Sequence, residues 1–497
     1  MFINRSHKIV FAIAFVIYFI TAVNSSGYYH FDEHYQIIEF ADLKMGINTT
    51  EDLPWEYNAR VRPSIQPYIC FICFKALRIL GITDPYFLSF FLRFLTMLLA
   101  LTAITMFIKS SKTLVQGECQ NIYIALSYLV WFLPFLNVRF SSETWSGLFF
   151  LLSVAMLNLN VLKNKKTFFL IGLFLGLSFL CRYQSAVLII ALGAWSAVIG
   201  RETIKNILIV FYGFVFVFIM GILIDSCFYG TLTLTSWNYF NFNILKGVAS
   251  SFGISPWSYY IGSIFFQSLF PIGIVILYCL CILLYKRPNL QVLWIIFPFL
   301  VLHSIIPHKE DRFLFPVINF VPLLLILGFQ ETGKYFVSAG KRPVFKIFIR
   351  VVVPFLFVIN FVGLIVMAFK PVGYGTKVIS RYIHNNYKEK PVFLICSKSD
   401  NPYKPLWFLN ESFYMDKNVR FIQTDAVLNN SFHILGGAPS SILYAIRKDE
   451  IDDPDTNAII HKYNLVYKTQ SIPDWMDALL KYYDSNYNDQ TLLLYGK

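Results

Sequence analysis

Eleven apolar stretches, each close to the length of a membrane-crossing helix, dominate this chain of 497 residues. A helix needs about 20 mainly apolar residues to cross a bilayer. So many stretches of that length cannot share one water-soluble core, so the sequence predicts a polytopic α-helical membrane protein. The stretches lie at residues 9–25, 85–108, 121–138, 145–162, 167–181, 185–200, 206–224, 259–284, 290–306, 312–330 and 344–369.

The composition agrees with this class. Hydrophobic residues make up 56% of the chain and charged residues only 14%, where a soluble domain carries about 25% charged residues. The 8 cysteines sit mostly inside apolar runs and show no disulfide framework. A cytosolic enzyme, a disordered scaffold and a disulfide-stapled secreted domain are therefore excluded.

The net charge of +13 reflects membrane topology. From Pro371 onward basic and acidic residues are equal in number, so the whole excess lies in the apolar part of the chain. Basic residues are expected at the cytoplasmic ends of membrane spans. We therefore expect no nucleic-acid partner.

Loop charge also decides whether residues 65–80, a twelfth and more interrupted apolar stretch, cross the bilayer. If they do not cross, every alternate connection is basic, as the positive-inside rule requires. The basic residues of these connections are Arg5, Lys8, Lys109, Lys112, Lys163, Lys165, Lys166, Arg201, Lys205, Lys286, Arg287, Lys334, Lys341 and Arg342. A twelfth crossing would abolish that bias, so eleven spans are expected, with the first loop and the C-terminus both outside.

The composition becomes polar after Lys370, which indicates a second domain. We expect a transmembrane catalytic domain at 1–370, with external loops at about 27–64 and 225–258, and a small soluble α/β domain at 371–497. In the latter, PVFLICS and TLLLYGK have the pattern of buried strands, while KVISRYIHNNY and DWMDALLKYYD have helical periodicity.

The first polar segment of interest is 30–46, directly after the first span. As a helix it places Asp32, Gln36 and Glu39 on one face, which fits an amphipathic helix at the membrane surface. An ordinary solvated helix and a catalytic one are equally compatible with that periodicity. The crowding of Asp32, Glu33 and Glu39 at a bilayer edge favours a general base.

Two further external segments carry cations. In LPWEYNARVRP, Arg60 and Arg62 could bind a phosphate or anchor at lipid headgroups. In PHKEDRF, a cationic cluster of His308, Lys309 and Arg312 stands between two spans on the side where the topology rule disfavours cations. That cluster suits a lipid phosphate at headgroup level.

Five motifs in one order identify a family. HFDEHYQ, PWEYNARVRP, LCRYQSAV, WNYFNFNILKGVASSFGISPW and PHKEDRFLFPV, between about His30 and Pro316, together resemble the α-mannosyltransferases of glycosyltransferase family 22. That family extends the glycosylphosphatidylinositol core and the dolichol-linked glycan. The resemblance implies a GT-C fold, an active site on the lumenal or periplasmic face, and a polyprenyl-phosphate mannose donor such as dolichyl phosphate mannose.

The resemblance also implies roles for particular residues. Asp32, or its neighbour Glu33, would deprotonate the acceptor hydroxyl in a single inverting displacement. His308, Lys309, Arg312 and Arg182 would hold the donor phosphate. Residues implied to position the substrates are His34, Gln36, Trp55, Glu56, Arg60, Arg62, Trp237, Asn241 and Trp257. No cluster offers a closed metal cage, so we expect neither a metal nor another cofactor.

Partners, alternatives and location complete the expectations. The partners would be the donor, a glycan or lipid-linked acceptor, and membrane lipids. The alternatives are the same fold with another polyprenyl-phosphate sugar, or a non-catalytic lipid-linked-glycan binder or transporter. Sequons at Asn48, Asn410 and Asn429 fit the endoplasmic reticulum, whereas the short basic N-terminus and appended domain favour a bacterial inner membrane.

Overall fold

A computed structural model describes residues 5–159, 164–388, 390–404, 409, 411–429, 441–483 and 491–497. Residues 160–162 of one predicted span, the basic residue Lys163 and the sequon asparagine Asn410 lie outside this part of the chain.

The chain divides into two compact units, neither of which is continuous in sequence. The helical unit consists of residues 1–21, 59–66 and 93–368. The composite unit consists of residues 22–58, 67–92 and 369–497. The C-terminal residues therefore share a unit with two segments that precede them by hundreds of residues. The boundary at residue 370, drawn from composition, stays a prediction.

All eleven apolar stretches form helices in their described parts. The helices are α1 (Arg5–Asn24), α6 (Pro85–Ser111), α7 (Gln120–Leu129), α8 (Phe132–Asn137), α9 (Ser142–Asn158), α10 (Lys165–Cys181), α11 (Ala186–Val198), α12 (Ile204–Tyr229), α14 (Tyr259–Gln267), α15 (Phe270–Lys286), α16 (Gln291–Ile305), α17 (Val321–Ser338) and α18 (Arg342–Phe369). Within the described residues, five helical segments are long and apolar enough to cross a membrane, or six if the bent pair α15 and α16 counts as one span. Eleven crossings remain a prediction.

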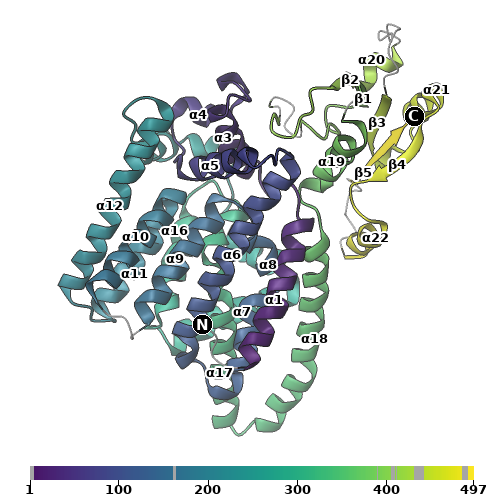
Figure 1. The fold of residues 1–497 in the computed structure, drawn as a ribbon. Coiled ribbons are helices and arrows are strands. Elements are labelled where there is room, and N and C mark those ends of the chain that lie inside the picture. Colours follow the sequence, from purple (N-terminus) through teal and green to yellow (C-terminus); the bar gives the residue numbers. More distant parts are fainter. Residues whose placement is uncertain are drawn as a thin grey trace. The chain divides into compact units, whose positions relative to one another are not determined.

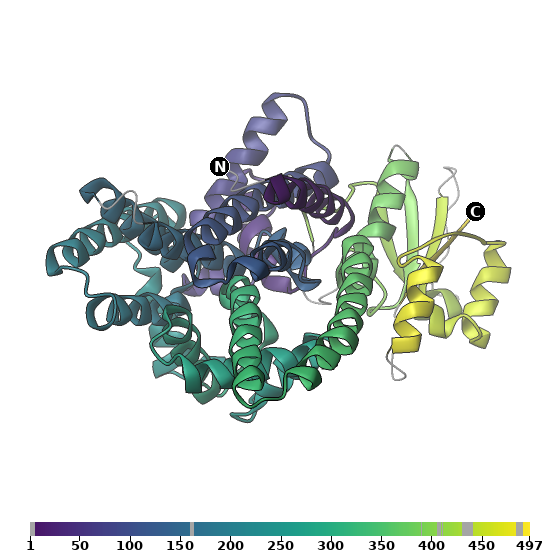
Figure 2. The ribbon, with the colours of Figure 1, turned by 90° about the horizontal axis from the view of Figure 1, so that it is seen from below.

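In the helical unit α10 packs against both α12 and α9, and its backbone approaches that of α12 closely. The three helices run side by side (Figure 1), and they stay adjacent in the view from below (Figure 2). A Cβ atom on Gly172 of α10 would collide with the carbonyl of Val210, and one on Gly213 of α12 would collide with the carbonyl of Phe169. Small residues at such crossings let helix backbones touch, which is how helices associate without a hydrophobic driving force.

A second close approach positions the segment after α16. Residues Asp311–Phe320 form the 3₁₀ helix η9, which continues into α17. A Cβ atom on Gly147 of α9 would lie 2.7 Å from Cα of Pro316, so only glycine admits η9 at this point. Asn319 of η9 and Asn137 of α8 also exchange side-chain amide hydrogen bonds of 2.9 and 3.0 Å. These contacts fix η9 against the beginning of α9.

Several short helices open the composite unit. They are α2 (Phe31–Glu33), the π-helix η1 (His34–Ile38), α3 (Glu39–Lys44), η2 (Thr50–Asp52), α4 (Trp55–Ala59) and α5 (Ile65–Ile79). His30 caps α2, because its Nδ1 accepts a hydrogen bond from the backbone N–H of Asp32. The wider π-helical turn η1 follows immediately, and such distortions are frequent at functional sites.

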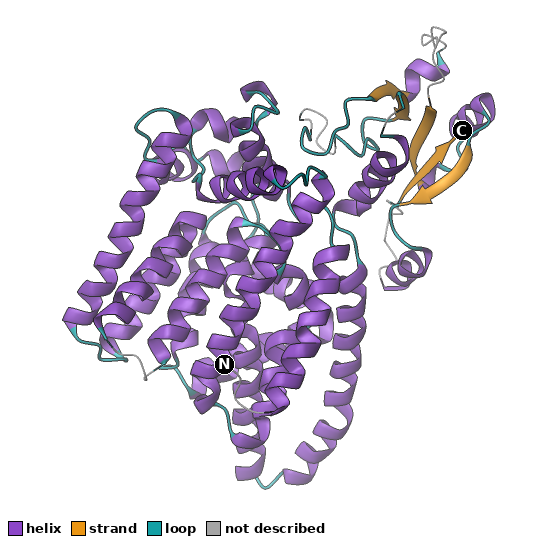
Figure 3. Ribbon diagram, viewed as in Figure 1, coloured by secondary structure: helices purple, strands orange, loops and turns teal. Residues whose placement is uncertain are grey.

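The C-terminal part of the composite unit contains all the strands in the described chain (Figure 3). They are β1 (Val392–Cys396), β2 (Val419–Gln423), β3 (Ser441–Arg447), β4 (Val466–Gln470) and β5 (Leu492–Gly496). Their order is β2-β1-β3-β5-β4. Strands β1, β2 and β3 are parallel, with Leu394 opposite Phe421 and Leu443, and β5 joins β3 and β4 in antiparallel fashion.

Helices cover both faces of this sheet, as the small α/β prediction requires. On one face, Ile379 and Ile383 of α19 (Thr376–Tyr387) pack on the alternate residues of the central strands. On the other, Ile459 of α21 (Pro454–Tyr463) and Val427 of α20 (Thr424–Leu428) do the same. The fourth α-helix in the described part of this region is α22 (Asp474–Tyr483). The two predicted strands and two predicted helices are confirmed within a residue or two at each end.

Candidate active site

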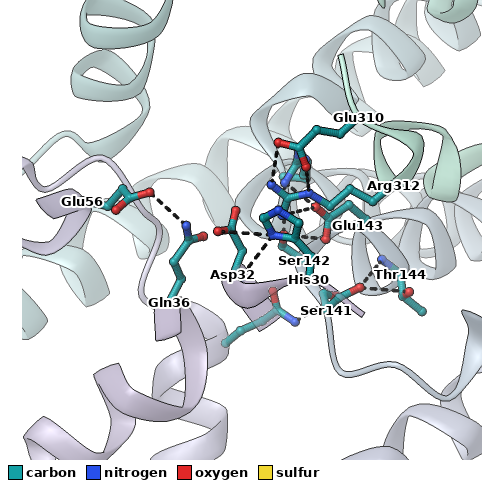
Figure 4. A network of polar contacts seen from close by, with 12 residues as sticks. His30, Asp32, Gln36, Glu56, Ser141, Ser142, Glu143, Thr144, Glu310 and Arg312 are labelled. Carbon is teal, nitrogen blue, oxygen red and sulfur yellow. Dashed lines mark hydrogen bonds and ion pairs between the residues drawn. The ribbon is translucent and has the colours of Figure 1, made fainter. Parts of the chain in front are cut away.

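The candidate base stands at the start of α2. The Asp32 side chain is 18% exposed, and its Oδ1 lies 3.5 Å from Nδ1 of His30. The two side chains are close neighbours in Figure 4. Glu33 is more deeply buried, at 9% exposure. Of the two adjacent carboxylates, Asp32 is thus the more accessible to a substrate hydroxyl.

The rest of the first segment is not a solvated amphipathic surface, contrary to that expectation. His34, Gln36, Glu39 and Asp42 are all buried, together with the apolar residues between them. The reason is that Leu409 and residues 411–414 of the same unit supply polar partners and aromatic rings on the polar side. For example, Glu39 Oε1 accepts a hydrogen bond from the backbone N–H of Phe413.

Glu39 is the centre of a buried polar cluster in the composite unit. Its carboxylate contacts His34 Nε2 at 2.8 Å and Asn48 Nδ2 at 2.8 Å. The His34 ring stacks between Tyr28 and Tyr414. Burial lowers the pKa of His34, so the neutral imidazole donates through Nε2. The Glu39 carboxylate therefore accepts hydrogen bonds from three separate chain segments, through His34, Asn48 and Phe413.

Asp42 is buried one helical turn beyond Glu39. It is fully inaccessible, and neither carboxylate oxygen has a hydrogen-bond partner among the described residues. Burial, followed by the charge of Glu39, raises the pKa of Asp42 to about 8. The Asp42 carboxyl is therefore protonated at neutral pH, because an isolated charge is costly to bury.

One of the predicted phosphate ligands, Arg312, lies in a largely buried ionic cluster of the helical unit (Figure 4). Arg312, in the first turn of η9, is 7% exposed and lies 3.1 Å from Oε1 of Glu143. Arg182, the residue after α10, donates to the same Oε1 at 2.6 Å. Glu310 pairs with Nε of Arg312 and accepts from its NH2 at 3.2 Å. We call these four side chains the arginine–glutamate cluster.

The other two predicted phosphate ligands have different surroundings. Lys309 Nζ donates to the carbonyls of Ile306 at 2.6 Å and Ser255 at 2.9 Å. Its ammonium thus holds the loop to the preceding residues and to the long external loop. His308 Nε2 lies 2.8 Å from Glu310 Oε1, which links it to the arginine–glutamate cluster.

The remaining predicted residues fall into separate places. Arg60 has a positive φ of 51° and donates to Thr231 Oγ1 at 2.5 Å, while the carbonyl of Arg62 accepts from Tyr229. Both therefore fasten their segment to the end of α12. Gln36 donates to Glu56 at 3.1 Å in the composite unit. Three tryptophans are exposed: Trp55 in α4, Trp237 in α13 (Thr235–Phe240) and Trp257 in the loop before α14. Asn241, at the start of η7 (Asn241–Leu245), is half-buried.

Sequence reasoning missed Glu143, which joins two of the predicted cations. It stands in the first turn of α9, after the N-cap Ser141, where the helix dipole favours a carboxylate. The available signal was its charge: it is an acidic residue at the edge of an apolar stretch, within RFSSETWSG. Intramembrane or near-membrane carboxylates usually have a buried partner.

Within the described residues, no group of three or more His, Cys, Asp or Glu side chains is placed to hold a metal ion. The expectation that no metal is needed stays a prediction.

The fold is that of a GT-C glycosyltransferase. The chain superposes on the structure of ArnT from Cupriavidus metallidurans bound to undecaprenyl phosphate, with a TM-score of 0.51 and 12% identity, covering 98% of this chain and 97% of that one. In this chain the helices α1 to α18 are followed by the C-terminal region that contains the sheet. The predicted GT-C fold is confirmed.

Sequence comparison identifies the family. Residues 9–396 match the Alg9-like mannosyltransferase family, and the chain belongs to it. Relatives include GPI mannosyltransferase 3 of Candida albicans (26% identity over 34% of this chain and 36% of that protein), mannosyltransferase APTG1 of Arabidopsis thaliana (25%, over 67% and 59%) and GPI alpha-1,2-mannosyltransferase 3 of Homo sapiens (24%, over 80% and 73%). The chain thus spans less than two thirds of the first two relatives. The resemblance seen in the motifs is confirmed.

Proposed function

We propose that this chain transfers mannose from a polyprenyl-phosphate mannose donor to a lipid-linked or glycan acceptor on the periplasmic or lumenal side of a membrane. Membership of the Alg9-like mannosyltransferase family supports the sugar. A fold relative described as bound to undecaprenyl phosphate supports a polyprenyl-phosphate ligand. The observation that carries the proposal is the arginine–glutamate cluster, in which the buried Glu143 holds two guanidinium groups together and the more exposed Glu310 occupies one edge of Arg312.

The proposed reaction is a single inverting displacement. Asp32 removes the proton of the acceptor hydroxyl while that oxygen forms a bond to the anomeric carbon. The bond between the anomeric carbon and the donor phosphate oxygen breaks, and the electron pair leaves on the polyprenyl phosphate. One new glycosidic bond replaces the old one, and the proton ends on the Asp32 carboxylate.

The chemistry assigns separate tasks to the two groups of residues. The leaving phosphate gains negative charge in the transition state, so preorganised cations stabilise the transition state more than the ground state. The side chains of Arg182 and Arg312 are only 6% and 7% exposed, and electrostatic interactions are stronger at buried positions than in water. Glu33, His34, Gln36 and Glu56 keep the segment that carries Asp32 in place.

A transfer assay tests the proposal. The purified chain is incubated with polyprenyl-phosphate mannose and candidate lipid-linked acceptors. We expect mannose transfer with inversion at the anomeric carbon, read from the coupling constants of the product, and the same rate with and without a chelator. Transfer from the glucose, arabinose or aminoarabinose analogue instead would establish the same fold with another sugar. Binding of donor without transfer to any acceptor would favour a lipid-linked-glycan binder or transporter.

A further inference from the structure

The two carboxylates of the arginine–glutamate cluster differ in burial and in the part of the guanidinium that they occupy. Glu143 is 2% exposed, whereas the Glu310 side chain is 23% exposed. Glu143 contacts the NH1 nitrogens of both Arg182 and Arg312. Glu310 contacts the Nε and NH2 edge of Arg312 with both of its oxygens.

Glu143 is fixed independently of Glu310. Its Oε2 accepts a hydrogen bond from Ser142 at 3.1 Å, and it belongs to the first turn of α9. The ring of Phe313 supports both arginines from another direction, with Arg182 and Arg312 at 4.9 and 5.6 Å from its centroid. Stacking and pairing of this kind restrict a guanidinium plane. The two arginines therefore keep their arrangement without a contribution from Glu310.

Glu310 occupies the place that a phosphate would take. The Nε and NH2 edge of arginine presents two parallel donors that match two oxygens of a carboxylate or of a phosphate. With Glu143 and Glu310 both ionised, the cluster of two arginines carries no net charge. If a phosphate replaced Glu310, the Nε and NH2 groups of Arg312 could bind two of its oxygens. The two arginines and Glu143 together would then carry one net positive charge, which the phosphate would neutralise.

We infer that Glu143 is a positioning residue that aims Arg182 and Arg312, and that Glu310 is a displaceable substitute for the donor phosphate on Arg312. The inference rests on the proposed function, because it takes the ligand to be a lipid phosphate. When the donor binds, its phosphate takes the Arg312 fork, and Glu310 turns toward solvent with its partner His308, 2.8 Å away.

Undecaprenyl phosphate, the leaving group without a sugar, is the probe for a binding test with purified full-length chain in nanodiscs. Glu310→Gln keeps the shape and removes the competing charge, so we expect binding about 10-fold tighter, as for the loss of one charge-assisted hydrogen bond from the competing state. Glu143→Gln should weaken binding about 10-fold, raise KM and lower kcat. Glu143→Asp, which restores the charge on a shorter side chain, should recover part of both.

Glu331→Gln is the matched control, because Glu331 pairs with an arginine of the same unit, Arg287, at 2.7 Å. This variant should leave undecaprenyl phosphate binding unchanged. Unchanged or weaker binding by Glu310→Gln would overturn the substitute role. Wild-type affinity in Glu143→Gln, or no recovery in a folded Glu143→Asp variant, would overturn the positioning role. If the wild-type chain neither binds the probe nor uses a polyprenyl-phosphate donor, the proposed function fails and this inference with it; a failure confined to the variants leaves the proposed function standing.

Discussion

The backbone N–H of Phe413 donates a hydrogen bond of 3.2 Å to Oε1 of Glu39, a residue 374 positions earlier in the chain. Near this bond, Tyr28 and Lys377 both pair with Glu411. Tyr35 donates to the carbonyl of Leu409 at 3.3 Å. The C-terminal residues therefore hold the segment that follows Asp32 through buried polar contacts.

Glu39→Gln should destabilise the composite unit. Oε1 of Glu39 accepts from both the Phe413 N–H and the His34 imidazole, and Oε2 accepts from Asn48 Nδ2. A glutamine amide whose oxygen replaced Oε1 would therefore present its NH₂ group to the NH₂ group of Asn48. An unsatisfied buried donor costs about 1–3 kcal/mol. We expect a lower apparent Tm of the purified chain and a higher KM. Glu51→Gln, at an exposed position of the same loop, serves as control, and an unchanged Tm in Glu39→Gln would contradict the structure.

Asp32→Asn should lower kcat by about 10² or more with donor binding retained, because it removes the proton acceptor and keeps the shape. Glu33→Gln, at the more buried neighbour, should cost less. The measurement is transfer at saturating donor together with undecaprenyl phosphate affinity. The opposite ranking of the two variants would move the base to Glu33, and full activity in both would end the proposed mechanism.

Arg312→Lys should reduce turnover strongly, since lysine keeps the charge but cannot contact Glu143 and two phosphate oxygens at the same time.

Lys309→Ala should also reduce turnover, by about 10- to 100-fold, because the ammonium that joins the 306–309 loop to Ser255 is lost. Lys334→Gln, an exposed cation paired with Glu331, should behave as wild type. Full activity of both Arg312→Ala and Lys309→Ala would show that phosphate is held elsewhere.

The raised pKa of Asp42, about 8, predicts a pH-dependent stability. An unfolded aspartate has a pKa of about 3.9, so the folded state binds the proton more tightly and loses stability as pH rises between these values, by about 1.4 kcal/mol per pH unit. Asp42→Asn should remove this loss. Apparent Tm values at pH 6 and pH 8 should differ less in the variant, and equal pH profiles would refute the assignment.

The predicted topology is tested by cysteine labelling in a background without the 8 native cysteines. Cysteines at Lys165 and at Ser250, both exposed in the structure, should react with membrane-impermeant reagent from opposite sides, Lys165 from the cytoplasm. A cysteine at the exposed Lys398 should behave as Ser250 does. Labelling of Lys165 from outside would invert the model.

Periodicity and length predicted the helices well because a membrane span is a local property. Each apolar stretch, from α1 to α18, forms its backbone hydrogen bonds within itself, so its position can be predicted without knowledge of its neighbours. The strands β1 and β5 form their hydrogen bonds with neighbouring strands, but their mostly buried apolar runs also made their positions predictable.

The candidate site was predicted only in part, because its pairings are non-local. The motifs located Asp32, Arg182 and Arg312, but no local pattern pairs Glu143 with arginines 39 and 169 residues further along. The charges of Arg182 and Arg312 are accordingly balanced by Glu143 and Glu310, whereas Lys309 donates to backbone carbonyls. In the same way, the amphipathic pattern of residues 30–46 could not reveal that Phe413 and Tyr414 cover its polar side.

The bond between Glu39 and Phe413 has a consequence for synthesis. At about 5–20 residues per second, roughly 20–75 s pass between the translation of one partner and of the other. During that interval every apolar helix from α6 to α18 has been made, while the carboxylate of Glu39 still lacks its C-terminal donor. A ribosome that stops at residue 400 would release a chain with all of its apolar helices and no residue to complete the loop that carries Asp32. The loop that carries Asp32 can therefore complete its buried contacts only after residues 411–414 have been made.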